Sequence, residues 1–293
     1  MHDYENHFLR SLIGIRKILA VTRNAKSSSV LNLAQTSPNV TLIEGNLDDP
    51  AGIFKAVKAQ TSTPVWGVFS VQDRPPILKK DDERRQGIAL IDESIKQGVK
   101  FFVYSSVDRG GEKRSFPNPT PVPHFIYKHE IEQYLIKRSK DADAKMAWTV
   151  AFLENFTPDY FGKVFTTAWQ MSLKGKPLQM VATSDIGFFA GEAFVRPDEF
   201  EGKALSLAGD ELTFEQMAAV FERLTGRKVP TTFQLPVWAM MAAVKDLGVM
   251  FEWFHDEGYG ADLAEMRRIN PDLKDFGKWL VEESQFDTLQ GRS

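Results

Sequence analysis

The chain has 293 residues, of which 43% are hydrophobic and 26% are charged, a composition typical of a globular protein with a sizeable core. Its formal net charge of -3 argues against a general nucleic-acid binder, and the absence of cysteine excludes disulfides, thiolate metal sites and cysteine catalysis. There is no apolar run of transmembrane length and no signal-peptide pattern at the start, so we expect a cytoplasmic protein, with the nucleus as a second compartment.

Strand-like runs alternate with helix-like segments through the first half of the chain. The expected strands are residues 15–23, 40–47, 65–72 and 101–105. The expected helices are residues 29–35, 52–60 and 84–98. Asp48, Asp49 and Pro50 form a typical helix start that leads into the second of them. This alternation predicts an α/β fold with a Rossmann-like, mostly parallel sheet and helices on both faces.

The second half is richer in aromatic residues and helical patterns. We expect a short strand at 179–182, a helix at 186–194, a helix that starts at Thr213 and stops at Gly226, and a helical tail from Pro236. The sequence predicts a nucleotide-binding domain over residues 1–155 and a smaller, mainly helical substrate or partner lobe over 156–293, with some segments returning to the sheet. Two roles are open for one group of residues in this tail, which are Met240, Met241, Met250, Phe251, Trp253 and Phe254. They could line a substrate pocket or pack in the core, and their helical spacing favours the core.

The fourth expected strand ends in two hydroxyl residues, Ser105 and Ser106, at the edge where open α/β sheets bind ligands. A helix follows and carries Lys128 near its start. A serine at a strand end and a lysine on the next helix form the layout of a nicotinamide site in folds like those of the short-chain dehydrogenases. Four residues before the lysine stands His124 instead of tyrosine, and Tyr127 points about 100° away from it. We therefore expect a site that holds a cofactor more clearly than it uses one, with Lys128 as the candidate catalytic residue.

Short segments spread over nearly the whole chain match one family in order. They are TRN (22–24), EGNLDDP (44–50), VYSSVDRGG (103–111), HFIYKHEIEQYL (124–135), FLENF (152–156), VATSDIGFFA (181–190), LSLAGDELTFEQ (205–216) and DFGKWLVEESQF (275–286). Together they resemble the NmrA-like family, an atypical branch of the short-chain dehydrogenases. The resemblance implies a Rossmann domain that binds NADP(H), in a family that includes redox-state sensors, transcriptional co-regulators and oxidoreductases.

The resemblance also implies cofactor contacts at the ends of the strands. The adenosine end would be held by Thr22, Arg23, Asn46, Leu47 and Asp48. The dinucleotide linkage would lie at the level of Phe69, Ser70, Val71 and Gln72. The nicotinamide end would be lined by Ser105, Ser106, Lys128, Phe152, Leu153, Glu154 and Asn155.

Several of these positions also have a structural alternative. Arg23 can fork onto the 2′-phosphate of NADP or be a solvated surface arginine. Asp48 can instead cap the following helix, Gln72 can belong to a plain strand exit, and Lys128 can be a solvated helix lysine. The charges at residues 80–85 are expected on solvated loop and helix faces.

Two departures from the family pattern weaken the cofactor expectation. Gly14 is the only glycine before Gly45, so no G-x-x-G-x-x-G occurs, and we expect the first strand and its phosphate-binding turn to be absent. A chain that lacks this strand and a coding sequence that is incomplete both explain the pattern. Val150 also runs directly into Ala151, where relatives carry a few more residues. If the lost backbone donors supplied ~3–4 kcal/mol, nucleotide affinity would fall by a factor of about 10² to 10³.

Three functions remain open on these observations. The first is an NADP(H)-linked redox-sensing or regulatory protein, weakly catalytic or non-catalytic, with a protein partner such as a transcription factor. The second is an NADP-dependent oxidoreductase of a biosynthetic pathway, acting on a small apolar substrate. The third is a degenerate interaction module that binds no nucleotide.

Other chemistry finds little support in the sequence. No metal site is expected, because the histidines lack paired ligand spacing: His2, His7, His124, His129 and His255. No G-x-S-x-G elbow surrounds either serine of the fourth strand, and we expect neither direct nucleic-acid nor membrane binding. The sequence does not determine the oligomeric state.

Overall fold

The computed structural model describes residues 17–72, 82–141, 145–150 and 159–289. Its contacts divide the chain into two compact units. The first unit comprises Met1–Ser106, Tyr127–Thr149 and Ile186–Ala204, and the second comprises Val107–Ile126, Val150–Asp185 and Leu205–Ser293. The domain boundary expected at residue 155 lies outside the described residues.

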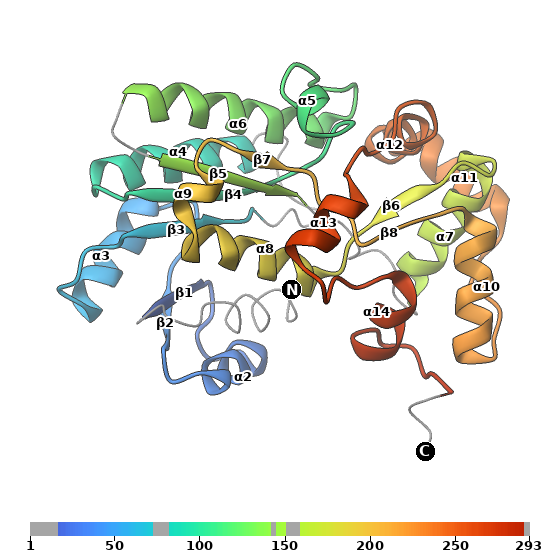
Figure 1. Cartoon of the computed structure of the whole chain (residues 1–293), viewed down its shortest axis with the longest axis horizontal. Helices are drawn as coiled ribbons and strands as arrows, with labels where there is room; N and C mark the ends of the chain where they lie inside the picture. The colour runs from blue at the N-terminus through green and yellow to red at the C-terminus, as the bar shows by residue number, and fades with distance from the viewer. Residues whose placement is uncertain (1–16, 73–81, 142–144, 151–158, 290–293) are drawn as a thin grey trace. The chain divides into compact units, whose positions relative to one another are not determined.

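The strands of the first unit form two sheets (Figure 1). β1 (Ile18–Thr22) pairs with β2 (Val40–Glu44) in parallel, with Ile18 opposite Val40. The other sheet has the order β3-β4-β5-β7, built from β3 (Gly67–Ser70), β4 (Phe101–Ser106), β5 (Lys145–Val150) and β7 (Ala204–Leu205). β3 and β4 are also parallel, which confirms the expected α/β class. Whether a further strand is missing between β1 and β3 falls on residues 1–16, which lie outside the described residues.

Helices cover both faces of the four-stranded sheet. The helices of the first unit are α2 (Ser28–Thr36), α3 (Pro50–Gln60), α4 (Asp82–Lys96), α6 (Pro123–Asp141), α8 (Thr183–Val195) and α9 (Pro197–Phe200), of which α2 packs on β2 of the two-stranded sheet. On one face, Phe102 and Tyr104 of β4 pack with Leu90 of α4 and Ile131 of α6. On the other face, Phe101 makes an edge contact with Phe194 of α8 at 5.6 Å between ring centroids. β4 is therefore buried on both sides, as its continuous apolar run predicts.

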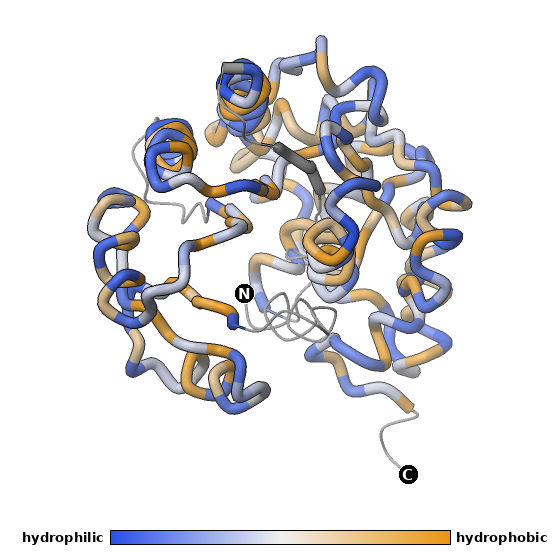
Figure 2. The backbone as a smooth tube through the Cα atoms, turned by 60° about the vertical axis from the view of Figure 1, so that its left-hand side comes forward, coloured by the Kyte–Doolittle hydropathy of each residue, from blue (hydrophilic) through white to orange (hydrophobic). Residues whose placement is uncertain are grey.

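The second unit is mainly helical. It contains α5 (Glu112–Ser115), α7 (Tyr160–Leu173), β6 (Leu178–Met180), β8 (Asp210–Leu212), α10 (Phe214–Thr225), α11 (Gln234–Ala243), α12 (Lys245–Asp256), α13 (Leu263–Ile269) and α14 (Phe276–Glu282). β6 and β8 pair antiparallel. Figure 2 shows hydrophobic and hydrophilic residues alternating along the helices, so each helix has an apolar side to bury.

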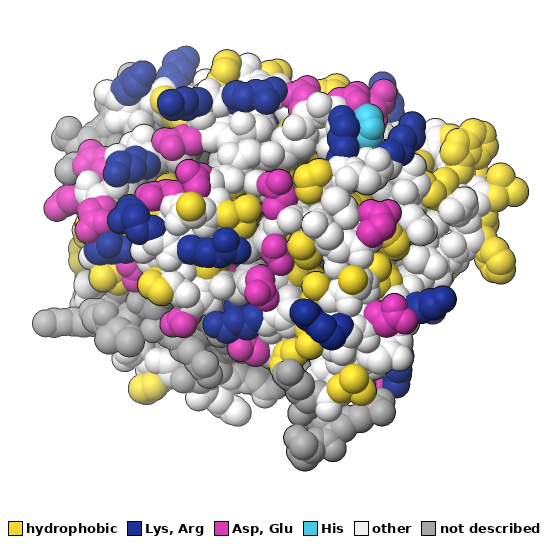
Figure 3. Space-filling model, turned by 45° about the vertical axis from the view of Figure 1, so that its right-hand side comes forward, with side chains coloured by type: hydrophobic (Ala, Val, Ile, Leu, Met, Phe, Trp, Pro, Cys, Tyr) yellow, Lys and Arg dark blue, Asp and Glu magenta, His cyan; other side chains and the backbone are white. Residues whose placement is uncertain are grey.

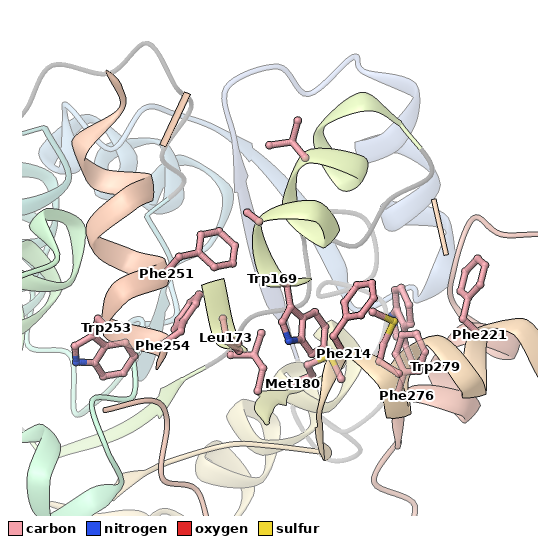
Figure 4. Packing of buried hydrophobic residues seen from close by; sticks show 14 of the residues in the cluster. Trp169, Leu173, Met180, Phe214, Phe221, Phe251, Trp253, Phe254, Phe276 and Trp279 are labelled. Atoms are coloured by element: carbon pink, nitrogen blue, oxygen red, sulfur yellow. The ribbon is translucent and has the colours of Figure 1, made fainter. Parts of the chain in front are cut away.

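The core of the second unit is strongly aromatic (Figure 4). Trp169 of α7 makes an edge contact with Phe214 of α10, and Phe276 stacks on Trp279 in α14. The methionine and aromatic residues of the tail belong to this core: Phe251, Trp253 and Phe254 are buried in it, and Met240, Met241 and Met250 pack against it. This supports the core interpretation of those residues.

Local sequence signals place several helix ends. Thr213 and Gln216 form a capping box at the start of α10, and Gly226 ends that helix with a φ of 69°. α11 begins at Gln234, two residues before the expected start, because a proline is tolerated in the first turn of a helix. No helix in the described parts of the chain combines the length and the apolar character needed to cross a membrane.

Candidate functional site

The carboxyl ends of β3 and β4 carry residues expected at the dinucleotide linkage, Ser70 and Gln72, and at the nicotinamide end, Ser105 and Ser106. Ser70 lies opposite Tyr104 in the parallel register, so the two strands end at nearly the same level. The side-chain amide of Gln72 donates to Ser70 Oγ at 2.7 Å, and Lys128 Nζ donates to the backbone oxygen of Ser105 at 3.3 Å. We call Ser70, Gln72, Ser105, Ser106 and Lys128, all of them buried, the sheet-edge cluster.

Lys128 is a buried lysine and not a solvated one. It is 8% exposed, and its Nζ lies 3.0 Å from Oε1 of Glu83 and 5.7 Å from the centre of the Tyr104 ring. The solvated-lysine alternative is therefore wrong. The ammonium group is held by an anion, a carbonyl oxygen and an aromatic face, which together compensate for its removal from water.

Glu83 corrects a second expectation, because it is 4% exposed and does not lie on a solvated face. On α4 it shares the inward stripe with Gly87 and Leu90, four and seven residues further on. A Cβ at Gly87 would come within 2.6 Å of Cδ1 of Ile131 in α6, so the two helices approach closely at this glycine. This close approach brings Glu83 within reach of Lys128. The stripe spacing was the signal in the sequence that could have identified Glu83.

Ser106 is bound by a second carboxylate that the sequence reasoning missed. Its hydroxyl donates to Oε1 of Glu132, and both side chains are buried. Glu132 follows Lys128 by four residues, which places both side chains on the same face of α6. The hydroxyl group of Ser106 and the ammonium group of Lys128 were both expected to meet a cofactor. Each of them has a carboxylate partner within the protein.

Two buried acceptor oxygens at this edge have no hydrogen-bond donor among the described residues. They are Oε1 of Gln72 and Oε2 of Glu83. Leaving a buried acceptor without a donor costs about 1–3 kcal/mol, so such oxygens are normally satisfied. Hydroxyl or amide groups of a bound molecule would supply the missing donors. A ribose and a carboxamide carry such groups, so these residues fit the nicotinamide end of a dinucleotide.

The expected adenosine-end residues gather at the carboxyl ends of β1 and β2. Thr22 pairs with Glu44 in the register, and its backbone oxygen accepts from the amide of Gly45 at 2.8 Å. Arg23, just beyond β1, has an exposed side chain. The structure therefore keeps Arg23 at the strand end and in contact with solvent, where a phosphate could reach it.

Asp48 accepts hydrogen bonds from α4 and does not cap the helix that follows it. The cap of α3 is Asp49, whose side chain accepts from the amide of Gly52 at 2.9 Å, so helix capping by Asp48 is wrong. Asp48 Oδ1 instead accepts from Gln86 at 2.9 Å and from Arg85 at 2.6 Å. These hydrogen bonds lower the pKa of Asp48, and the one from Gln86 has the largest effect.

The first turn of α4 therefore contacts both groups of expected residues. Glu83 faces Lys128, whereas Arg85 and Gln86 face Asp48. Among the remaining expected residues, Leu47 packs against the core, Phe69 is partly buried and Val71 is exposed. Phe152, Leu153, Glu154 and Asn155 lie outside the described residues. Within the described ranges, no group of three or more histidine, aspartate or glutamate side chains is arranged to hold a metal ion.

The chain is similar over most of its length to proteins of one family. The profile of the NmrA-like family matches residues 12–288. An NmrA-like family domain-containing oxidoreductase, lnbB, from Aspergillus flavus is 27% identical over 76% of this chain and 69% of its own length. The nitrogen metabolite repression protein nmr from Neurospora crassa is 27% identical over 66% of this chain and 45% of its own length.

Among solved structures, the triphenylmethane reductase from Citrobacter sp., complexed with NADP(H), superposes with a TM-score of 0.66. The superposition covers 94% of this chain and 93% of that protein, at 14% sequence identity. At this identity the likeness shows the fold.

Proposed function

The chain belongs to the NmrA-like family, and we propose that it binds NADP(H) and acts as a redox-sensing or regulatory protein with little or no catalytic activity. The observation that carries the proposal is the sheet-edge cluster. Together with Glu83 of α4, which pairs with Lys128, it places two buried acceptor oxygens that lack donors among the described residues at the edge where open α/β sheets bind ligands. The similarity to a nitrogen metabolite repression protein and to a reductase complexed with NADP(H) supports the same direction.

Different residues of the first unit would bind different parts of the dinucleotide. Arg23, exposed beyond β1, would bind the 2′-phosphate that distinguishes NADP from NAD. Gln72, expected at the level of the dinucleotide linkage, and Glu83 would accept hydrogen bonds from the ribose and the carboxamide of the nicotinamide end. When bound, NADP(H) would supply a hydride donor or acceptor.

The contacts of Lys128 and the residue at position 124 support a weakly catalytic or non-catalytic role. Lys128 is paired with Glu83 and lies over Tyr104, so its side chain is already engaged within the protein. The residue four positions earlier on α6 is His124, so a phenol that could donate a proton there is absent from that position. A sensor needs only the bound cofactor and a surface for its partner, for which a transcription factor is our candidate.

An NADP-dependent oxidoreductase acting on a small apolar substrate is the second candidate. The similarity to an oxidoreductase of the NmrA-like family favours it. In this case Lys128, as the buried amine of the cluster, would be the residue that handles a proton.

Calorimetric titration with NADPH, NADP⁺ and NAD⁺ tests the binding proposal. We expect tighter binding of the phosphorylated forms, and we expect Arg23→Ala to remove that preference while leaving NAD⁺ binding unchanged. Arg227→Ala is the matched control, because Arg227 is an exposed arginine of the second unit that pairs only loosely with Asp287 at 3.6 Å. A folded chain that binds none of the nucleotides would overturn both candidate functions and leave an interaction module.

Steady oxidation of NADPH separates the two candidates. A sensor should bind NADPH without oxidising it in the presence of carbonyl or quinone acceptors. Turnover that disappears in Lys128→Met, with NADPH binding retained, would instead establish the oxidoreductase.

A further inference from the structure

A long uncharged segment lies in the second unit. Residues 229–244 contain no aspartate, glutamate, lysine or arginine, and they are bounded by Lys228 and Lys245. In a chain that is 26% charged, sixteen uncharged residues in a row normally indicate a buried element. The segment includes all of α11 (Gln234–Ala243).

α11 nevertheless buries only one side. Val237 lies in the core of the unit, whereas Leu235 and Trp238 on the opposite side are 75% and 60% exposed. Ala239 and Ala242 continue this exposed face at helical spacing. Phe233, immediately before the helix, is 83% exposed.

The start of α7 extends the exposed apolar surface. α12 runs alongside α7 in the same direction, because Phe251 contacts Phe165 and, further along α12, the backbone oxygen of His255 accepts from Nζ of Lys176, three residues beyond the end of α7. α11 joins α12 at Val244 and packs against both helices, so it runs back along α7. Its end near Val244 therefore lies toward the first turn of α7, where Tyr160 and Phe161 are exposed.

We call these exposed side chains the α11 patch: Tyr160, Phe161, Phe233, Leu235, Trp238 and Val244. Figure 3 shows hydrophobic side chains gathered at one edge of the surface in view. A covered aromatic side chain buries roughly 150–250 Å², so four aromatic residues that are 58% to 83% exposed offer roughly 550 Å². With Leu235, Val244 and the alanines, the patch approaches the ~800 Å² that each partner contributes to a standard interface.

We propose that the α11 patch is the self-association surface of this protein and that it packs against the same patch of a second copy. Its composition is that of an interface core, which is rich in aromatic residues and poor in charge. Lys228 and Lys245, which bound the uncharged segment along the chain, are both exposed.

The chemistry of the patch favours a second copy over other occupants. A helix that lies on a lipid surface carries lysine and arginine on its polar side, and α11 has no charged residue at all. A different protein would normally be selected by complementary charge, which the patch does not offer. A second copy presents an equally apolar surface, and a two-fold contact brings the same residues together from both sides.

Sedimentation velocity over a range of protein concentrations tests the proposal. We expect a dimer in the full chain and a rise of at least about 30-fold in the dimer dissociation constant for Trp238→Glu, since central tryptophans are typical hot spots. Leu235→Glu should act in the same way. Leu31→Glu is the matched control, because Leu31 is an exposed leucine on α2, outside the patch, and should leave the dimer intact.

Three outcomes would overturn the proposal. They are a wild-type chain that stays monomeric at all concentrations, a dimer that tolerates both patch substitutions, and a monomer that binds neutral phosphatidylcholine vesicles through the patch. Circular dichroism and the melting temperature show whether each variant is folded, and Leu235→Glu serves if Trp238→Glu is not.

Discussion

At the scale of single residues, the Lys128–Glu83 pair has a measurable energetic signature. Removing one partner of a buried ion pair leaves the other charge without compensation, which costs about 3–5 kcal/mol. We therefore expect Glu83→Gln to lower the free energy of unfolding by about 3 kcal/mol, measured by urea titration. Glu199→Gln is the control, because Glu199 is largely exposed and its pair with Arg196 is a surface pair worth under about 1 kcal/mol.

A double variant separates the pair from general damage to α4. Glu83→Gln combined with Lys128→Met removes both charges, so most of the lost stability should return. If the double variant is as unstable as the sum of the two single variants, the two side chains are not coupled and our account of the site is wrong.

Asp185 gives a prediction about pH within the second unit. It is buried, and burial raises its pKa to about 6 from 3.8, against the opposing effect of the hydrogen bond from the backbone amide of Lys274. Asn270 also donates to its carboxylate at 3.0 Å. Between pH 6 and pH 3.8 the folded chain holds this proton more tightly than the unfolded chain does, so this group adds stability as the pH falls.

The expected gain is about 2 kcal/mol between pH 7 and pH 4, relative to Asp185→Asn, which cannot titrate. Urea unfolding of both proteins across this range measures the difference. A difference that stays constant with pH would show that Asp185 titrates normally in the folded chain, in spite of its burial.

At the scale of elements, α10 shows what a local signal contributes. Its capping box satisfies two backbone donors, with Thr213 accepting from the amide of Gln216 at 3.3 Å and Gln216 accepting from the amide of Thr213 at 2.8 Å. We expect Thr213→Ala to lower the free energy of unfolding by about 1 kcal/mol. Thr231→Ala, in an exposed loop position before α11, should change it by less than half as much. Equal effects of the two changes would refute the contribution of the cap.

Local signals of this kind explain which parts of the fold can be predicted from the sequence. Helix ends such as Thr213 and Gly226 depend on residues within a few positions of one another, so they can be read along the chain. The hydrophobic run of β4 likewise predicts a buried strand. The cap of α3 is harder to predict, because both Asp48 and Asp49 are chemically able to cap and only the backbone geometry selects Asp49.

The candidate site was harder to predict because its contacts join distant segments. Glu83 meets Lys128 across 45 positions, and the pairing depends on the close approach of α4 and α6 at Gly87. Arg85 reaches Asp48 across 37 positions. In one sequence such charges look like solvated residues, because nothing next to them in the chain indicates that a partner will bury them.

At the scale of the whole molecule, the division of the strands into two sheets predicts uneven stability. In the described part of the first unit, β1 has β2 as its neighbour, whereas β4 is paired on both sides and buried throughout. A two-stranded sheet is marginally stable by itself, and side chains of β1 are at most partly buried. Local opening should therefore be easier in the β1–β2 sheet than in the four-stranded sheet.

Native-state hydrogen exchange measures this difference directly. We expect amides of β1 and β2 to exchange at least about tenfold faster than those of β4, which corresponds to a gap of about 1.4 kcal/mol in opening free energy. Because Thr22 ends β1 and Arg23 follows it, bound NADPH should slow exchange in this sheet. Equal protection of both sheets without nucleotide would mean that they open as one unit. If NADPH slowed exchange in β4 alone, the nucleotide would not bind at the end of β1. This result would contradict the role proposed for Arg23.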